Sequence, residues 1–220
     1  MPIFNNILAG ASGQSTGYDI DQSLRFNGTG EGASGDYLSR TTASAGSGSW
    51  TLSTWVKPSN LSDGSWASAI FGAKGSSTYA TQIYFQDDDK IRWFESSGGV
   101  AGQINPTTSV FRDPSAWYHL VFQKNGSTSM KIYKNGELLQ TTTTTVPATS
   151  SATESGATIY IGQAANTSST RFASFCGYQA EVHFIDGTVL DASSFGETDA
   201  ATNQWKPIEV TGLTYGTNGF

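Results

Sequence analysis

Residues 117–139 read Trp-Tyr-His-Leu-Val-Phe-Gln-Lys-Asn-Gly-Ser-Thr-Ser-Met-Lys-Ile-Tyr-Lys-Asn-Gly-Glu-Leu-Leu, and this stretch decides the fold. It contains two Asn-Gly pairs, each set between runs rich in β-branched, aromatic and aliphatic side chains. Asn-Gly in such a setting is the strongest short-range signal for a tight hairpin, because both central residues of a type I′ turn need a positive φ. The stretch therefore predicts a β-meander.

The first strand of this meander carries large apolar groups on both of its faces. Successive side chains of a strand alternate between the two faces of a sheet. The two sets are Tyr118, Leu120 and Phe122 on one face, and Trp117, His119, Val121 and Gln123 on the other. We therefore expect this strand to lie between two layers, as it would in a β-sandwich.

Composition and charge narrow the class of protein. The chain has 220 residues, which suits one all-β domain, and its 25 glycines and 14% charged residues suit short strands joined by tight turns. We expect very little helix. The net charge is −6 and only 12 residues are Lys or Arg, so binding to a nucleic-acid backbone is not expected.

Cysteine usage and hydropathy indicate where the chain is made. Cys176 is the only cysteine, so an intramolecular disulfide is impossible. The start Met-Pro-Ile-Phe-Asn-Asn lacks the basic and apolar regions of a secretory signal peptide. No stretch approaches the roughly 20 apolar residues that span a bilayer. We expect synthesis in a reducing cytoplasm and no membrane insertion.

Residues 1–22 differ from the rest of the chain. They are small and polar, apart from four apolar residues near the tip, which are Ile3, Phe4, Ile7 and Leu8. Such a segment cannot bury enough apolar surface to fold alone. It is predicted to be either an arm that docks on another chain or an untethered tail. The apolar tip favours docking, because a solvated tail gains nothing from it.

Strand signals begin at residue 23 and continue to residue 186. Beyond the meander, strands are predicted at 23–27, 37–40, 49–57, 69–73, 80–86, 91–95, 107–111, 140–145, 157–162 and 172–186. Pro58 ends one of them, and the last is long enough to bend near Cys176 and Gly177. No repeat of 20–50 residues is visible, which argues against propellers and solenoids. The pattern weakens over residues 191–220, which either pack on the sandwich edge or lead into a further module.

Five stretches together resemble the laminin-G-like members of the concanavalin A-like lectin/glucanase superfamily in order and spacing. They are residues 49–58, 117–122, 131–138, 159–162 and 177–187. The resemblance implies an all-β fold, a jelly-roll sandwich of two antiparallel sheets with an extended N-terminal arm. It divides the chain into an anchoring or oligomer-docking arm at 1–22, a laminin-G-like domain at 23–190 and a C-terminal extension at 191–220.

A narrower resemblance is to structural proteins of marine tailed bacteriophages. It is carried by residues 4–14, 23–27, 37–41, 180–187 and 194–199. It implies a virion component, such as a fibre, tail-associated or capsid-decorating protein, whose arm contacts other virion proteins. It also implies a homo-oligomer, with a trimer favoured, and a chain that continues beyond a Tyr-Gly-Thr-Asn-Gly-Phe segment like that of residues 215–220.

Catalysis is not expected, although the superfamily includes glycoside hydrolases. Those relatives carry a Glu-x-Asp-x-x-Glu motif, which this chain lacks. Glu181 and Asp186 are five residues apart and fall on opposite faces of a regular strand. Glu181 and His183 share a face and are either an acid/base pair or, as we expect, a satisfied polar pair. His119 is expected to be packed. A glycan-degrading enzyme remains the alternative function.

Two candidate binding sites can be named, and neither a metal nor a cofactor is required by the sequence. Asp87, Asp88 and Asp89 are the best cluster of oxygen ligands for calcium, with Asp63 as a further ligand if the fold brings it close; the alternative is a solvated hairpin tip. No other cofactor is expected. A site for host-surface glycans needs exposed aromatic rings beside polar groups. Trp66, Tyr79 and Trp93 are the candidates, the alternative being ordinary packing.

Overall fold

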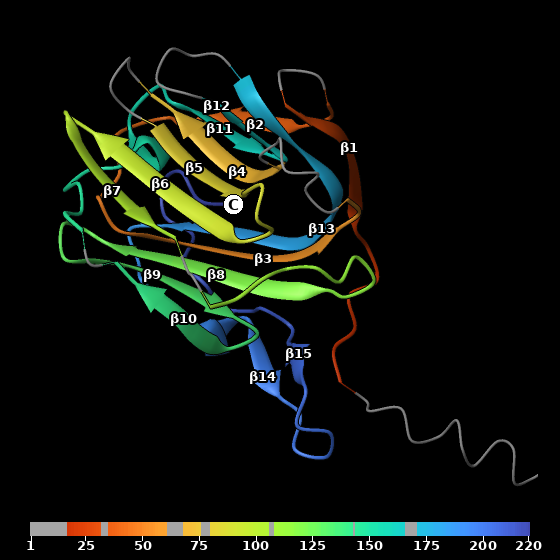
Figure 1. The fold of residues 1–220 in the computed structure, drawn as a ribbon. Coiled ribbons are helices and arrows are strands. Elements are labelled where there is room, and N and C mark those ends of the chain that lie inside the picture. Colours follow the sequence, from red (N-terminus) through yellow and green to blue (C-terminus); the bar gives the residue numbers. More distant parts are fainter. Residues whose placement is uncertain are drawn as a thin grey trace, which may run out of the picture.

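The computed structural model describes residues 17–31, 35–60, 68–75, 80–105, 108–142, 144–165 and 171–220. Two antiparallel sheets face each other as a sandwich (Figure 1), which confirms the predicted fold class. Two short 3-10 turns, Ser151–Thr153 and Ala192–Ser194, accompany the strands. No helix within these described ranges is long and apolar enough to cross a membrane.

The first sheet, sheet A, has the strand order β1-β13-β3-β8-β9-β10, with β12 also paired to β13. Its strands are β1 (Leu24–Glu31), β3 (Trp50–Pro58), β8 (Tyr118–Asn125), β9 (Ser129–Lys134), β10 (Glu137–Thr141), β12 (Gln163–Ala165) and β13 (Arg171–Asp186). The second, sheet B, has the order β2-β11-β4-β5-β6-β7. Its strands are β2 (Leu38–Thr41), β4 (Ser68–Lys74), β5 (Ala80–Phe85), β6 (Ile91–Ser97), β7 (Val100–Ile104) and β11 (Thr158–Ile161). A separate pair joins β14 (Gly196–Thr198) to β15 (Trp205–Pro207).

The predicted meander is β8, β9 and β10. Asn135 and Gly136 both have positive φ, 49° and 82°, as a type I′ turn requires. The first Asn-Gly pair behaves differently, because Asn125 still pairs with Ser129 in the ladder and only Gly126 has a positive φ. That connection is a three-residue loop, closed by a hydrogen bond from the Thr128 amide to the Asn125 carbonyl.

One predicted strand is wrong. Gly98 and Gly99 both have positive φ, so the chain reverses at once and forms β7 at Val100–Ile104, where no strand was predicted. The expected strand at 107–111 is absent from its described part, residues 108–111. Phe111 packs instead against Phe85 and Tyr118, with ring centroids 5.2 and 5.0 Å apart. The adjacent glycines Gly98 and Gly99 thus form a hairpin turn between β6 and β7, where the sequence suggested a longer loop.

The main core fills the space between the sheets with aromatic rings. Trp50 of β3 lies 4.9 Å from Trp93 of β6 and 5.7 Å from Phe184 of β13, measured between ring centroids. All three side chains are fully buried. Replacing such a ring by Ala typically costs about 3–5 kcal/mol, so this cluster holds the two sheets together.

The C-terminal extension packs back onto the sandwich and covers part of the outer face of sheet A. Figure 1 shows β14 and β15 on the side of sheet A that is turned away from sheet B. The cluster formed there unites strand residues with the extension, and consists of Val121, Ile185, Ala192 and Phe195 with Tyr133, Leu190, Trp205, Val210, Leu213 and Tyr215 around them. The expectation that β8 lies between two layers is confirmed, and the outer layer is this extension.

The last residues run beside the second half of β13. The Phe184 and Phe220 backbones exchange hydrogen bonds of 2.9 and 3.0 Å, and the Asp186 amide donates to the Tyr215 carbonyl at 2.9 Å. Strand β1 pairs with β13 only over its first half, from Ala173 to Gln179. Between the two partners β13 bulges, and Glu181 in this bulge has φ of 46°. The tail therefore continues the sheet edge that β1 begins.

Candidate functional site

Four outward side chains line up across sheet A where the C-terminal extension does not cover it. Arg25 of β1 pairs with Tyr178 of β13, and Tyr178 pairs with Lys57 of β3. Trp117 immediately precedes β8 and continues the line beyond Lys57, because the next residue of β8 pairs with the residue before Lys57. We call Arg25, Tyr178, Lys57 and Trp117 the outer row.

Strand alternation explains why the outer row points outward. The residues that follow or precede its members, Phe26, Val56 and Tyr118, belong to the core between the sheets. Side chains of neighbouring strand residues point to opposite faces. Directly opposite side chains in an antiparallel pair have Cβ atoms about 4.5–5.5 Å apart, so two cations and two aromatic rings lie within reach of one small ligand.

A cavity opens beside the outer row. It has a volume of about 270 Å³ and is lined by Trp55, Trp117, Ala180 and Pro207 together with residues 20–23. Trp117 is 37% exposed, whereas Trp55, which lines the same cavity, is 7% exposed. Asp21, Gln22 and Ser23 supply a carboxylate, an amide and a hydroxyl at the rim. We call this cavity with its lining the outer pocket.

The outer pocket and the outer row combine two kinds of group. The Trp117 ring meets Tyr178 edge to face, with centroids 6.5 Å apart, so the indole is held but keeps exposed surface. An exposed aromatic ring can stack on the apolar face of a sugar ring while polar neighbours bond its hydroxyls. Arg25 and Lys57 add donors that suit a carboxylate or sulfate group.

The covered half of the same face is closed and internally satisfied. His119 is fully buried and stacks between Trp55 and Trp205, with centroids 4.9 and 5.8 Å away. Its Nδ1 accepts a hydrogen bond from the Trp205 indole at 2.9 Å, and its Nε2 lies 2.8 Å from the Ser53 hydroxyl. Burial, together with the smaller effect of the nearby charge of His183, lowers the pKa of His119 to about 3. His119 is therefore a packed, neutral imidazole, as expected.

Glu181 and His183 form the polar pair that the sequence suggested. The His183 Nε2 and a Glu181 oxygen are 3.2 Å apart, and His183 Nδ1 is 2.8 Å from the Tyr215 hydroxyl. The Tyr18 hydroxyl donates to the other Glu181 oxygen at 2.9 Å, and this bond to a carboxylate raises the pKa of Tyr18. The cluster thus ties the N-terminal segment and the C-terminal extension to β13.

A second buried polar cluster lies between the sheets and was not predicted. Glu95 is fully buried and accepts hydrogen bonds from the Thr81 hydroxyl at 3.1 Å and the Trp93 indole at 3.4 Å. Burial raises the pKa of Glu95 to about 7. The Lys124 ammonium, also buried, donates to the carbonyls of Gly48, Gly126 and Pro147. In the sequence, the only indication that Glu95 would be buried was that strand alternation places it on the same face of β6 as Trp93.

Of the three residues predicted to bind glycans, the structure describes one, Trp93. Trp93 is fully buried in the core beside Trp50, so its proposed role as an exposed platform is wrong. It lies on β6, next to the edge strand of sheet B, and faces sheet A, because its partner in β5 is the core residue Ile83. Trp66 and Tyr79 lie outside the described residues, as do Asp63 and the four apolar arm residues, which are Ile3, Phe4, Ile7 and Leu8.

The three aspartates of the predicted calcium site do not come together as a ligand set. Asp88 pairs with Lys90 at 2.7 Å, and Asp89 pairs with Arg112 at 2.9 Å. The Lys90 hydrogen bond lowers the pKa of Asp88. Asp89 has φ of 60°, which turns the chain between β5 and β6. Within the described ranges no group of three or more His, Cys, Asp or Glu side chains is arranged to hold a metal ion.

The outer row itself was missed, although its members were visible. Trp117 was assigned to the strand face that carries His119 and Val121, but its partners come from β1, β3 and β13, which are distant in sequence. Their registers bring Arg25, Tyr178 and Lys57 into line. Strand order cannot be read from local pattern, so no local signal would have assembled this site.

Comparison with known proteins agrees with the architecture. Residues 29–193 match the family model described as the concanavalin A-like lectin/glucanases superfamily. No curated protein sequence matches the chain. A heptameric SAP-like pentraxin from Limulus polyphemus is similar in structure, with a TM-score of 0.53, 18% identity and coverage of 76% of this chain and 77% of that one.

Two other solved structures share the fold. The CBM40 of the Ruminococcus gnavus IT-sialidase, bound to alpha2,6 sialyllactose, has a TM-score of 0.51 at 10% identity, covering 80% of this chain and 96% of its own. Domains LG4-5 of the mouse laminin alpha1 chain give a TM-score of 0.53 at 13% identity, with coverage of 88% of this chain and 46% of theirs. At these identities the likeness is one of fold.

Proposed function

Because the chain belongs to the concanavalin A-like lectin/glucanase superfamily, we propose that it is a non-catalytic virion protein that binds surface glycans through the outer pocket. The observation that carries the glycan part is the exposed Trp117 indole beside the Asp21, Gln22 and Ser23 polar groups. A cavity of this size admits one or two sugar rings at its mouth, with Trp117 as the stacking surface.

The absence of catalysis is part of this proposal. The carboxyl group with a raised pKa, Glu95, is sealed in the core, where no polysaccharide can reach it. Glu181 is engaged by Tyr18 and His183 at its two oxygens. The alternative, a glycan-degrading enzyme, has one favourable observation, the hydrogen-bonded Glu181 and His183 pair. Release of reducing sugar that Glu181→Gln abolishes would establish that alternative and overturn the non-catalytic assignment.

The virion part of the proposal rests on the bacteriophage resemblance of the sequence. In this picture the arm at residues 1–22 anchors the protein to other virion proteins, and the domain projects as a fibre, tail-associated or capsid-decorating element. A homo-oligomer, with a trimer favoured, follows from the same resemblance. A cryo-EM map of a virion containing this chain is the direct test, and particles that lack the domain would refute this role.

We further propose that glycan binding needs no metal ion. The outer pocket offers stacking and hydrogen-bonding groups, and the acidic turn at residues 87–89 lies on sheet B, where Asp88 and Asp89 are paired with basic side chains. Glycan binding is expected to be unchanged by EDTA. Loss of binding in EDTA that calcium restores would show instead that a metal site contributes.

Glycan-array binding of the whole chain tests the main proposal. Trp117→Ala is expected to weaken binding about 10-fold, because it removes the stacking surface, and stacking of a planar ring on one aromatic side chain is worth about 1–3 kcal/mol. Leu138→Ala is the matched control, since Leu138 is an exposed apolar side chain, 52% accessible, on the distant strand β10. Unchanged binding in Trp117→Ala, with loss in Trp66→Ala or Tyr79→Ala, would move the site to the loops named from the sequence.

A further inference from the structure

The two sheets end side by side and leave an apolar groove between their edges. Strand β1 is the edge of sheet A and β2 is the edge of sheet B. Residues of both strands line the same cavity, together with β11, β13 and the tail. We call the surface formed by Leu24, Leu38, Ile161, Val182 and Phe220 the edge groove. Leu24 and Leu38 are 54% and 48% exposed, which is unusual for two neighbouring leucines.

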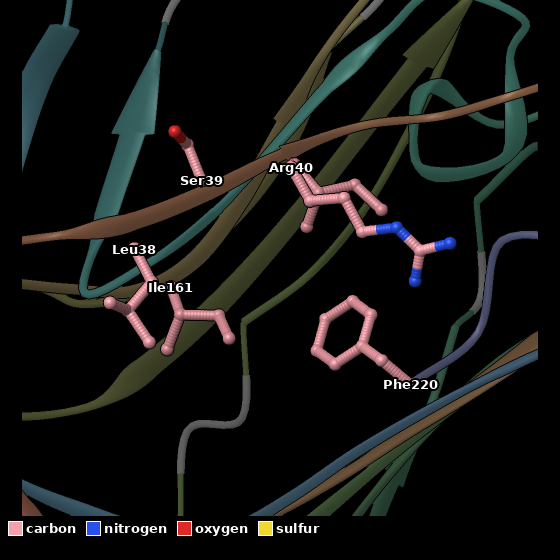
Figure 2. A pocket seen from close by; sticks show the side chains of 6 residues that line it. Leu38, Ser39, Arg40, Ile161 and Phe220 are labelled. Atoms are coloured by element: carbon pink, nitrogen blue, oxygen red, sulfur yellow. The ribbon is translucent and has the colours of Figure 1, made fainter.

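The edge groove has depth as well as apolar surface. Its larger cavity has a volume of about 450 Å³ and its smaller one about 140 Å³, and Leu38, Ile161 and Phe220 line both. Figure 2 shows Leu38 and Ile161 next to each other with the Phe220 ring facing them. Cavities of about 300–1,000 Å³ are typical of sites that enclose a ligand, so the larger one can take apolar side chains.

Strand β2 offers backbone groups along this groove. Among the described strands β2 pairs only with β11, so its other edge is open to a further strand. Arg40 stands at the far end, where its guanidinium lies 5.8 Å from the Phe220 ring centre and donates to the Gly219 carbonyl at 3.0 Å. An extended peptide can add to such an edge and place alternate side chains in the cavities.

The N-terminal segment leaves from the rim of this groove. Tyr18 bonds to Glu181, and Glu181, Gln22 and Ser23 line the larger cavity. Residues 20 and 21 line the outer pocket, which shares Gln22 and Ser23 with the larger cavity. The first described residues of the chain therefore lie between the edge groove and the outer pocket.

We propose that the edge groove of one copy binds residues 3–8 of the arm of a second copy, added as a strand along β2. That segment, Ile-Phe-Asn-Asn-Ile-Leu, is the apolar part of the arm. In an extended peptide Phe4 and Leu8 fall on one face, so both side chains can point into the groove. The proposal rests on the assembly part of the proposed function and names the surface that the arm occupies.

Light scattering on the full-length chain tests this. Wild type is expected to form an oligomer, and Leu38→Asp and the double variant Phe4→Asp with Leu8→Asp are expected to be monomers. Leu138→Asp is the matched control, because Leu138 is an equally exposed leucine on the edge strand at the other end of sheet A, and it is expected to stay oligomeric. A monomeric wild type, or oligomers that survive both Leu38→Asp and the arm variant, would overturn the proposal.

Cross-linking decides whether the arm comes from a second copy. In a Cys176→Ser background, one chain carries Leu38→Cys and another carries Leu8→Cys. The mixture is expected to form a disulfide-linked dimer of the two chains under mild oxidation. A disulfide that forms only within a single chain bearing both cysteines would overturn the exchange. Glycan binding by Leu38→Asp should equal wild type, which shows that the variant is folded and separates this result from failure of the glycan site.

Discussion

The outer face of sheet A has two halves built on the same strands, of which one is covered by the C-terminal extension and the other is exposed. Toward one end His119, Val121 and Ile185 lie under the C-terminal extension, in a layer as closed as the core. Toward the other end the outer row projects without this cover, and Trp117 keeps 37% of its surface. The extension, not the pleat of the strands, determines which half can meet a ligand.

The two halves differ in whether their polar groups are already hydrogen-bonded within the chain. Both nitrogens of His119 have partners within the chain, so this side chain has no hydrogen-bonding capacity to offer a ligand. Buried polar groups must be satisfied in this way, because an unpaired one costs about 1–3 kcal/mol. The outer pocket instead presents Asp21, Gln22 and Ser23 at its exposed rim.

The largest expected effect is on the pH dependence of the covered half. The pKa of His119 is about 3 in the folded protein against 6.5 in the unfolded chain, so the unfolded state takes up a proton first as pH falls. The stabilisation is complete above pH 6.5 and is lost as pH falls toward 3. By linkage the free energy of unfolding should drop by about 3 kcal/mol between pH 7 and pH 4 through this group alone.

Chemical denaturation of wild type and His119→Gln at several pH values measures this loss. Glutamine can still accept from Trp205 and donate to Ser53, but it does not titrate, so the variant should lack this part of the acid destabilisation. The difference between the two proteins should therefore shrink or reverse as pH falls from 7 to 4. If the free energies of unfolding of the two proteins fell in parallel with pH, His119 would be protonated without opening the covered half.

The next effect concerns the cover itself. Trp205→Ala removes the ring that stacks on His119 and packs against Gly136 and Gly196, where an added Cβ would lie only 2.4 and 2.7 Å from the indole. It should cost about 2–3 kcal/mol of unfolding free energy, less than a fully buried tryptophan, and leave His119 Nδ1 unpaired. Trp117→Ala on the open half should cost under about 1 kcal/mol. Equal losses in thermal or urea unfolding would erase the distinction between the halves.

The sequence revealed the covered half better than the open one. Alternation in β8 showed that both faces of the strand carry apolar groups, and this followed from residues that are adjacent in the chain. It could not show that the second layer is the C-terminal extension, because residues 191–220 have few apolar runs and the contacts of Trp205 with His119 span 86 positions. The covering layer is therefore a tertiary property.

The candidate site depended even more on long-range register. Trp93 looked exposable from its position near a turn, yet its pairing with Ile83 turns it into the core. Trp117 is the residue that the fold leaves accessible. The hairpin at Gly98 and Gly99 shows the same limit at short range, since positive φ at both glycines made a turn in place of a loop. Local chemistry predicted strands, and strand order decided which aromatic ring is free.

The smallest expected effect is on the preference of the open half for acidic over neutral glycans. Arg25 and Lys57 stand at cross-strand positions on either side of Tyr178, so an acidic sugar stacked near Trp117 would meet two cations. Among array glycans that differ only by a carboxylated or sulfated sugar, wild type should prefer the acidic form. Lys57→Gln and Arg25→Gln should each reduce that preference about 2–5-fold, because exposed ion pairs contribute up to about 1 kcal/mol. Lys131→Gln, on the same face but on β9, is the matched control and should leave the preference unchanged.

Added salt should weaken the binding of acidic ligands more than that of neutral ones, since exposed charges are screened. Equal binding of acidic and neutral partners by wild type would show that the outer row contributes its rings and not its charges.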